Sequence, residues 1–169
     1  IQAIESGREP NLGAQPTLGV KWPNDIVVGE KKLAGILVEM RGESYGPVDI
    51  VMGVGVNLDL PVAWHEQIDQ PATDIKAVYG KPLLRNQLAA DLISRLVDTC
   101  QRFDESGFDP FKEPWSQRDQ YRYKQVALRI GGTLHKGISQ GVDKSGALLL
   151  QQGDKQRTFH SGEISGLEQ

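Results

Sequence analysis

One lysine stands where its charge could do chemistry. Lys32 heads an apolar run (KLAGILVE), and an ammonium group directed into a lined cavity pairs with carboxylate or phosphate groups. By the two-residue period of a strand, Ala34 and Ile36 would share its face. The residue alone also allows a simpler interpretation, in which Lys32 lies at the end of a hairpin and extends its ammonium into water.

Short polar side chains precede this lysine in the stretch VKWPND. Pro23 provides no backbone hydrogen-bond donor and favours an extended Trp22, so the strand is expected to end there. Asn24 and Asp25 then lie at a junction between two strands, where their side chains can bind a ligand or the backbone. An Asx-turn is the simpler alternative, and residue type alone favours it.

Two glycines and an amide follow in the stretch VMGVGVNL. Gly53, Gly55 and Asn57 share one face of the predicted strand. A ligand or a second backbone segment that approaches closely is the usual reason for so bare a face, and Asn57 would offer a donor and an acceptor at its end. A helix packed closely on the sheet is the alternative. Together with Lys32, these residues predict a pocket with a bare floor, one cation and several polar groups.

The elements that would position these residues are short strands. The apolar runs between residues 17 and 58 are separated by tight turns containing glycine, which favours an antiparallel meander. The runs are almost continuously apolar, and this predicts a sheet covered on both faces. Residues 61–82, with their prolines and mixed polarity, predict a loop with one or two helical turns.

Helices and a second unit are predicted downstream. Asn86 can cap a helix over 86–105, and Asp109 with Pro110 predicts the start of a shorter one. The apolar stripe of the first helix is Leu88, Leu92, Leu96, Cys100 and Phe103. From about residue 120, short strands alternate with GG, DKSG and GD turns, which is typical of a small β-barrel. We therefore predict two domains, 1–119 and 120–169.

Composition excludes several classes of function. The 169 residues, 38% hydrophobic and 24% charged, are typical of a soluble globular protein. A net charge of −3 gives no positive field for nucleic acid or anionic lipid. No apolar run approaches the roughly 20 residues of a membrane helix, and no signal peptide is recognisable. The single cysteine fits a reducing compartment, so a cytoplasmic location is expected.

Other reactive residue types form no pattern. His65, His135 and His160 are far apart and have no ligand spacing, which argues against a metal site. Cys100 continues an apolar helical stripe and is interpreted as a core residue rather than a nucleophile. The sequence has no GxxxxGK[ST] loop, which excludes a P-loop nucleotide site.

The three polar stretches together resemble one family of enzymes. KWPND at 21–25, KLAGILVE at 32–39 and GVGVNL at 53–58 are similar to segments of the biotin protein ligases. The tail GISQGVDKSGALLLQ, from residue 137, resembles their C-terminal SH3-like barrel. The likeness begins near residue 18 and implies an α+β fold. Part of a mixed or antiparallel catalytic sheet, of the class II synthetase and biotin ligase type, would precede a small SH3-like β-barrel.

The resemblance implies a reaction in two steps. Such enzymes use biotin and ATP with Mg²⁺ to make biotinyl-5′-adenylate, and then transfer the biotinyl group to a lysine of biotin carboxyl carrier protein, a component of acetyl-CoA carboxylase. Lys32 is implied to contact the biotin carboxylate and the adenylate phosphate. Asp25 is implied to lie beside the adenylate and to orient the acceptor amine. These two are the candidate catalytic residues.

The remaining matches are to residues that bind the adenylate or shape its pocket. Asn24 corresponds to a position beside the adenylate, and Asn57 to one at its adenine end. The glycines that would form the floor, or allow a strand to approach the ligand, are Gly35, Gly53 and Gly55. The residues that would shape the site without reacting are Trp22 and Pro23.

The chain also departs from the family pattern. Some relatives have a tryptophan in the loop after the GVN strand, whereas this loop reads DQPATDI, and some have a basic residue after GEIS, where this chain has Gly166. The chain opens on Ile1 without a methionine, so we expect a C-terminal fragment that is inactive alone. The family's glycine- and arginine-rich loop would precede it. DNA would be a partner only if a winged helix lay upstream, and a homodimer could form through the edge of the 33–40 strand.

Two other functions stay open. Lipoate–protein ligases share the catalytic fold and use a lysine on an acyl-adenylate, but the combination of KWPND with a tail barrel argues against them. A non-catalytic module that docks a carrier protein is the alternative from another class. Such a module would have no need of Lys32, Asp25 and Asn57 together over a glycine floor.

Overall fold

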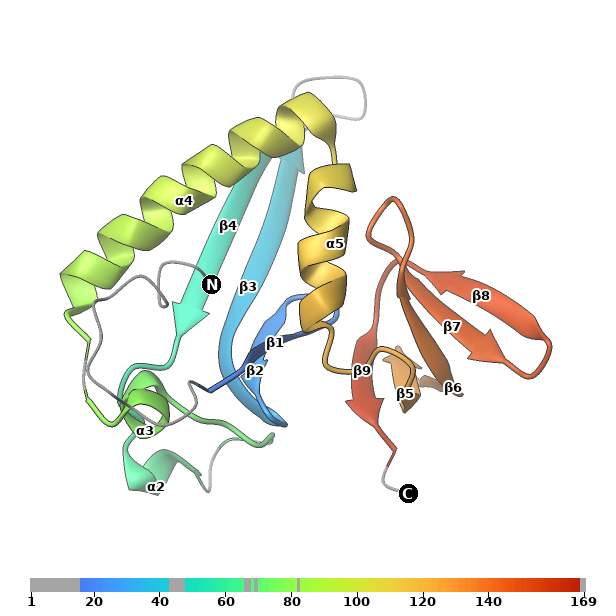
Figure 1. Ribbon diagram of the computed structural model, residues 1–169, viewed down its shortest axis with the longest axis horizontal. Helices are drawn as coiled ribbons and strands as arrows, with labels where there is room; N and C mark the ends of the chain where they lie inside the picture. Colours follow the sequence, from blue (N-terminus) through green and yellow to red (C-terminus); the bar gives the residue numbers. More distant parts are fainter. Residues whose placement is uncertain (1–15, 43–47, 66–67, 69, 82, 168–169) are drawn as a thin grey trace.

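A computed structural model of the chain describes residues 16–42, 48–65, 68, 70–81 and 83–167. They form two antiparallel sheets, and α5 lies between them (Figure 1). The elements are β1 (Leu18–Lys21), β2 (Asp25–Val28), β3 (Lys31–Gly42), β4 (Val48–Val56), α2 (Val62–His65), α3 (Ile75–Tyr79), α4 (Arg85–Ser106), α5 (Asp109–Arg118), β5 (Gln125–Ile130), β6 (Thr133–Val142), β7 (Leu148–Gln152), β8 (Lys155–Phe159) and β9 (Glu163–Gly166). The predicted α+β class is confirmed.

The first sheet is the predicted antiparallel meander, with the strand order β1-β2-β3-β4. Its first turn spans residues 22–24, and the Trp22–Pro23 peptide bond within it is cis. Gly29 has a φ of 59° in the second turn, a conformation that glycine adopts at little cost. The segment after β4 contains two short helices, α2 and α3, as expected for residues 61–82.

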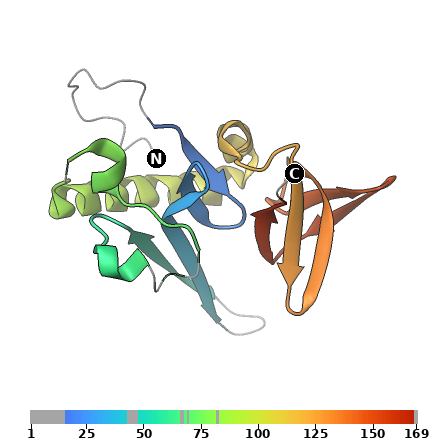
Figure 2. The same ribbon diagram turned by 90° about the horizontal axis from the view of Figure 1, so that it is seen from below.

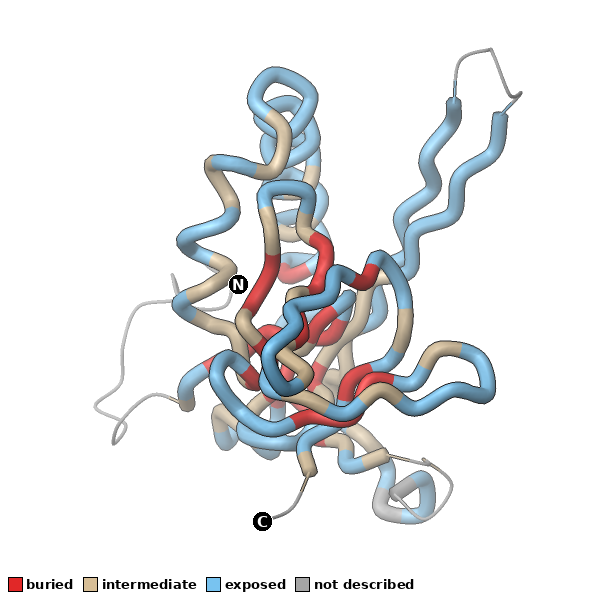
Figure 3. The backbone as a smooth tube through the Cα atoms, turned by 90° about the vertical axis from the view of Figure 1, so that its right-hand side faces the viewer, coloured by how far each residue is buried: buried red, intermediate tan, exposed pale blue. Residues whose placement is uncertain are grey.

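The prediction that both faces of this sheet are covered is wrong for the described residues. Leu18, Leu33 and Ile75 form a buried cluster at one end of the sheet. The far half of β3 and nearly all of β4 are exposed, and Met40 is 74% exposed. Figure 3 shows these two strands projecting from the body. An apolar run indicates a surface that can be buried, and no described element buries this one.

The two long helices agree with the predicted positions but differ in detail. Leu84 rather than Asn86 is the N-cap of α4, and its side chain makes no capping hydrogen bond. Phe108 precedes α5, which continues through Pro114 to Arg118. Cys100 is exposed, so the interpretation as a core residue is wrong. Of the predicted apolar stripe only Leu88 is buried, and Phe103 remains 54% exposed although its ring lies 6.4 Å from that of Phe111 in α5.

The second sheet, seen from below in Figure 2, has the strand order β8-β7-β6-β5-β9. Its strands contribute to one apolar core. The hydrogen-bonded ladder does not close into a barrel, because the two edge strands of the described sheet, β8 and β9, do not pair with each other. The buried members of its core are Trp22, Tyr121, Val126, Leu128, Val142, Leu148, Leu150, Phe159 and Ile164. One of these, Trp22, comes from the turn between β1 and β2. No helix of the described residues is long and apolar enough to cross a membrane.

The segment after α5 joins the two sheets. Asp119 forms a parallel bridge with Val20 of β1, and the Gln120 N–H donates to the Val20 carbonyl at 2.9 Å. The Asp119 Oδ1 accepts a hydrogen bond from the Tyr121 N–H at 3.0 Å, whereas its Oδ2 is buried without a hydrogen-bond partner. Burial therefore raises the pKa of Asp119, although the Tyr121 N–H and the Arg122 charge oppose this shift.

We expect Asp119→Asn to raise the Tm at pH 7.5 by a few degrees, because an amide keeps the bond to Tyr121 and removes a desolvated charge. A carboxyl whose pKa is higher in the folded state than in the unfolded state lowers the free energy of unfolding at pH values above its folded-state pKa. This cost decreases as the pH falls towards 3.8, the pKa of the carboxyl in the unfolded chain. The gain should therefore shrink in thermal melts run at decreasing pH. Asp154→Asn, in an exposed turn, is the control and should give no gain in Tm at pH 7.5 or at lower pH.

Candidate active site

Three neighbouring strands place the candidate residues in one row across the first sheet. Asp25 of β2 lies opposite Gly35 of β3, which in turn lies opposite Gly55 of β4. Leu37 and Gly53 form the next pair on the same face. Residues that oppose one another in an antiparallel ladder share a face, so a carboxylate and three glycines lie together on one surface.

A β-bulge brings Lys32 onto that surface. Ile26 pairs with Ala34, but Val27 pairs with Lys32, so Leu33 is an extra residue on β3. Lys32 therefore shares its face with Val27 and Asp25. The expectation that Ala34 and Ile36 share the face of Lys32 is wrong, because it assumes an uninterrupted two-residue period.

The bulge produces the central contact of the site. The Lys32 ammonium Nζ lies 2.7 Å from the Asp25 Oδ1, and the two side chains are 31% and 10% exposed. Lys32 thus turns back across the sheet instead of extending into water. Gly35 leaves the room for this pair, because a Cβ at that position would lie 3.0 Å from the Lys32 Cε and 3.1 Å from the Asp25 Oδ1.

Asn24 continues the pairing of the strands past the end of β2. Its Nδ2 donates to the Ile36 carbonyl at 2.8 Å, and its own carbonyl accepts from the Ile36 N–H at 2.9 Å. The side chain therefore bonds a neighbouring strand rather than its own turn. This pair of bonds fixes the turn of residues 22–24 against β3, directly beside Asp25.

A cavity of about 610 Å³ lies over these residues. Its lining includes most of the predicted binding residues, namely Asn24, Lys32, Gly35, Gly53, Gly55 and Asn57. A Cβ at Gly55 would meet no atom within 4 Å, and one at Gly53 would come no closer than 3.9 Å, to the Leu37 carbonyl oxygen. Among the described residues no helix packs on the glycines, so that alternative explanation of the bare face is not observed.

Asn57 holds the backbone at the end of the cavity. Its Nδ2 donates to the carbonyls of Lys32 at 3.3 Å and Thr73 at 3.0 Å. The Asn57 N–H donates to Leu33 and the Asn57 carbonyl accepts from Ile75. Both amide hydrogens are thus used within the protein, so only the Oδ1 can meet a ligand. The sequence suggested a ligand contact and missed this bridging role.

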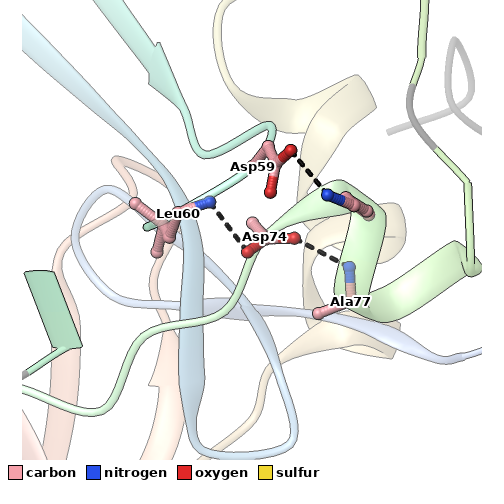
Figure 4. A network of polar contacts seen from close by, with 5 residues as sticks. Asp59, Leu60, Asp74 and Ala77 are labelled. Atoms are coloured by element: carbon pink, nitrogen blue, oxygen red, sulfur yellow. Dashed lines mark hydrogen bonds and ion pairs between the residues drawn. The ribbon is translucent and has the colours of Figure 1, made fainter. Parts of the chain in front are cut away.

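A polar network around Asp74 lies in the segment that follows β4 (Figure 4). The buried Asp74 is the N-cap of α3: it accepts from the Ala77 N–H at 2.7 Å and from the Leu60 N–H at 3.0 Å. An exposed pair between Lys76 and Asp59, at 2.8 Å, flanks it. The stretch TDIKA contains a signal from which this cap could be predicted, because an aspartate directly precedes the apolar Ile75.

Three of the predicted residues do not line the cavity, namely Asp25, Trp22 and Pro23. Asp25 is connected to it through its ion pair with Lys32, which does line it. Trp22 is 5% exposed and packs into the core of the second sheet, and Pro23 is exposed in the turn. In the described part of the chain, no group of three or more histidine, cysteine or acidic residues is placed to hold a metal ion. The arrangement therefore offers one cation, one carboxylate and an open glycine floor, which suits an extended ligand with an anionic centre.

Comparison with known proteins gives matches to both parts of the chain. Residues 8–57 match the biotin/lipoate A/B protein ligase family, and residues 124–166 match the biotin protein ligase C-terminal domain. A bifunctional ligase/repressor, BirA, from Salmonella typhimurium is 38% identical over 91% of this chain and 48% of its own length. A biotin–[acetyl-CoA-carboxylase] ligase from Paracoccus denitrificans is 32% identical over 82% of this chain and 59% of its own.

The fold is similar to that of solved structures. A biotin protein ligase from Aquifex aeolicus, in complex with biotin and ATP, superimposes with a TM-score of 0.73 at 27% identity. The match covers 88% of this chain and 61% of that one. The chain thus spans about half the length of the BirA relative and 59% of the length of the Paracoccus denitrificans ligase.

We expect Gly35→Ala to separate Lys32 from Asp25, because the added methyl group would lie within contact distance of both side chains. A crystal structure of the variant should show the Nζ–Oδ1 distance increased by at least a few tenths of an ångström. Gly55→Ala is the matched control, since its methyl group enters open space. An unchanged 2.7 Å pair in Gly35→Ala would show that Gly35 is not needed for the contact.

Proposed function

We propose that this chain, which belongs to the biotin protein ligases through its catalytic-domain and C-terminal-domain segments, is part of an enzyme that attaches biotin to a carrier protein. The first step joins the biotin carboxylate to the α-phosphorus of ATP, breaks the bond to the β-phosphate and releases pyrophosphate. The second step transfers the biotinyl group from AMP to a lysine amine. The observation that carries this proposal is the Lys32–Asp25 pair over the glycine floor.

The charge of Lys32 suits the first step. A carboxylate that attacks a phosphate brings two anions together, and a fixed cation is worth most as charge accumulates in the transition state. With no ligand bound, Asp25 balances the ammonium at 2.7 Å and holds it at the cavity. An anionic adenylate would compete with Asp25 for the same ammonium. Asp25 would then be available to orient the acceptor amine in the second step.

The remaining residues provide shape and placement. Gly35, Gly53 and Gly55 leave room for the ligand to lie against the backbone of β3 and β4. Asn24 keeps the turn beside Asp25 in place, and Asn57 anchors the strand that begins with Lys31 at the proposed adenine end. Trp22 and Pro23 act outside the cavity, on the geometry of the turn.

Substrates and partners follow from the same assignment. We infer ATP and biotin as substrates, with Mg²⁺ entering on ATP, and biotin carboxyl carrier protein as the acceptor. The chain would act as a catalytic portion, 1–119, with an accessory domain, 120–169, in the cytoplasm. A homodimer could form along β3 from Leu37 onward, where β2 no longer pairs with it. DNA would be a partner only through a further domain.

A lipoate ligase is the second candidate considered, and the match of residues 124–166 to a domain named for biotin ligases disfavours it. A docking module without catalysis is disfavoured by the ion pair, because binding a protein surface does not require an ammonium over an open glycine floor.

The experiment that tests the function is biotin-dependent exchange of labelled pyrophosphate into ATP. We expect exchange by the complete protein and none, or far less, by the 169-residue chain alone. Lipoate replaces biotin in a parallel reaction. Exchange with lipoate only would make the protein a lipoate ligase, and no exchange with either acid would favour the docking module.

In the complete protein, Lys32→Ala should slow biotin-dependent exchange by at least about tenfold, or about 1.4 kcal/mol of transition-state free energy. Lys31→Ala is the matched control, because Lys31 is an adjacent, exposed lysine on the same strand and does not line the cavity. It should retain the parent rate. Equal rates for both variants and the parent would remove Lys32 from the mechanism.

A further inference from the structure

Trp22 connects the candidate site to the second sheet. It directly follows β1, and two residues after it comes Asn24, the first residue that lines the cavity. Its side chain, however, is 5% exposed and belongs to the core formed by β5, β6, β7, β8 and β9. The indole Nε1 donates a hydrogen bond to the Gly146 carbonyl at 3.0 Å, across 124 positions of the sequence. The turn at residues 22–24 is therefore held from outside its own sheet.

The group that receives this hydrogen bond lies in a turn with its own internal order. The Asp143 Oδ1 accepts from the Ser145 N–H and the Ser145 hydroxyl, both at 2.7 Å, and from the Ala147 N–H at 3.0 Å. The backbone closes the same turn through Asp143 N–H to Ala147 carbonyl, at 2.9 Å, and Gly146 has a φ of 81°. The bonds from Ser145 lower the pKa of Asp143, so this carboxylate is ionised at neutral pH.

The turn of residues 22–24 also contacts the candidate reacting groups. Asn24 makes two hydrogen bonds to Ile36, and Asp25 forms the ion pair with Lys32. A displacement of Trp22 would move Pro23 and then Asn24 and Asp25, because these residues follow it directly in the chain. It would therefore disturb both the hydrogen bonds to Ile36 and the ion pair. Residues 143–147 do not line the cavity themselves.

We propose that the turn of residues 143–147 is a positioning element for the adenylate-forming site, acting through Trp22. Asp143 orders the turn, the Gly146 carbonyl holds the indole, and the indole fixes the position of Asn24 and Asp25. The kinetic part of this inference rests on the proposed ligase function, whereas the structural coupling does not depend on it.

The test is Asp143→Ala in the complete protein, read first by NMR. Loss of the carboxylate should shift the indole N–H signal of Trp22, assigned by its disappearance in Trp22→Phe, and should shift the amide signals of Asp25 and Lys32. Asp143→Asn keeps an acceptor oxygen and should restore the parent spectrum in large part. Asp154→Ala removes a charge from another exposed turn of the same sheet and is the control. Unchanged methyl signals of Leu128 and Ile164 would show that the core of the sheet is intact.

The kinetic readout separates positioning from stability. We expect Asp143→Ala and Trp22→Phe to lower kcat for pyrophosphate exchange by about tenfold with little change in KM for biotin, because small misplacements of reacting groups mainly affect the rate. Trp115→Phe, which alters another tryptophan packed on the same core, should retain the parent kcat. Parent kinetics in Asp143→Ala despite a shifted indole signal would overturn the proposal, as would unshifted Asp25 and Lys32 signals. If the parent protein shows no exchange, the ligase function fails, and the NMR result alone decides the coupling.

Discussion

The β-bulge at Leu33 is the constraint on which the candidate site depends. It changes the face of Lys32 and so lets an ammonium meet the Asp25 carboxylate over Gly35. A regular ladder would point Lys32 to the opposite side of the sheet, away from the glycines. The extra residue is stabilised by its own burial, because Leu33 is 0% exposed in the cluster with Leu18 and Ile75. The packing of Leu33 on one face of the sheet therefore maintains the ion pair between Lys32 and Asp25 on the other face.

Much of the fold could be predicted, because particular residues allow few alternatives. Pro23 ends a strand, Gly29 turns the next hairpin, and the spacing of Gly53 and Gly55 marks a bare face. The bulge could not be predicted, since Leu33 looks like any other strand residue. Cys100 was misinterpreted for a related reason: periodicity shows which side of a helix is apolar but does not show whether another element covers it.

The sequence predicted which residues come together at the site, but it did not predict the contacts that each of them makes. Residue types and the family resemblance identified Lys32, Asp25 and the glycines, and the structure brings them together. The bridging bonds of Asn57 depend on a backbone carbonyl 16 residues away, and the destination of the Trp22 side chain depends on Gly146. Contacts at such separations follow from the tertiary fold, and no local pattern in the sequence contains them.

The burial of Trp22 in the second sheet also has a consequence for the order of synthesis. The indole is translated well before Phe159 and Ile164, which belong to the same buried core. Domains usually fold as they leave the ribosome. The turn beside Asp25 therefore lacks the core that holds its indole until β8 and β9 have been translated and packed. A chain released early would carry every cavity-lining side chain, yet it would lack the core that secures the turn joining β1 and β2.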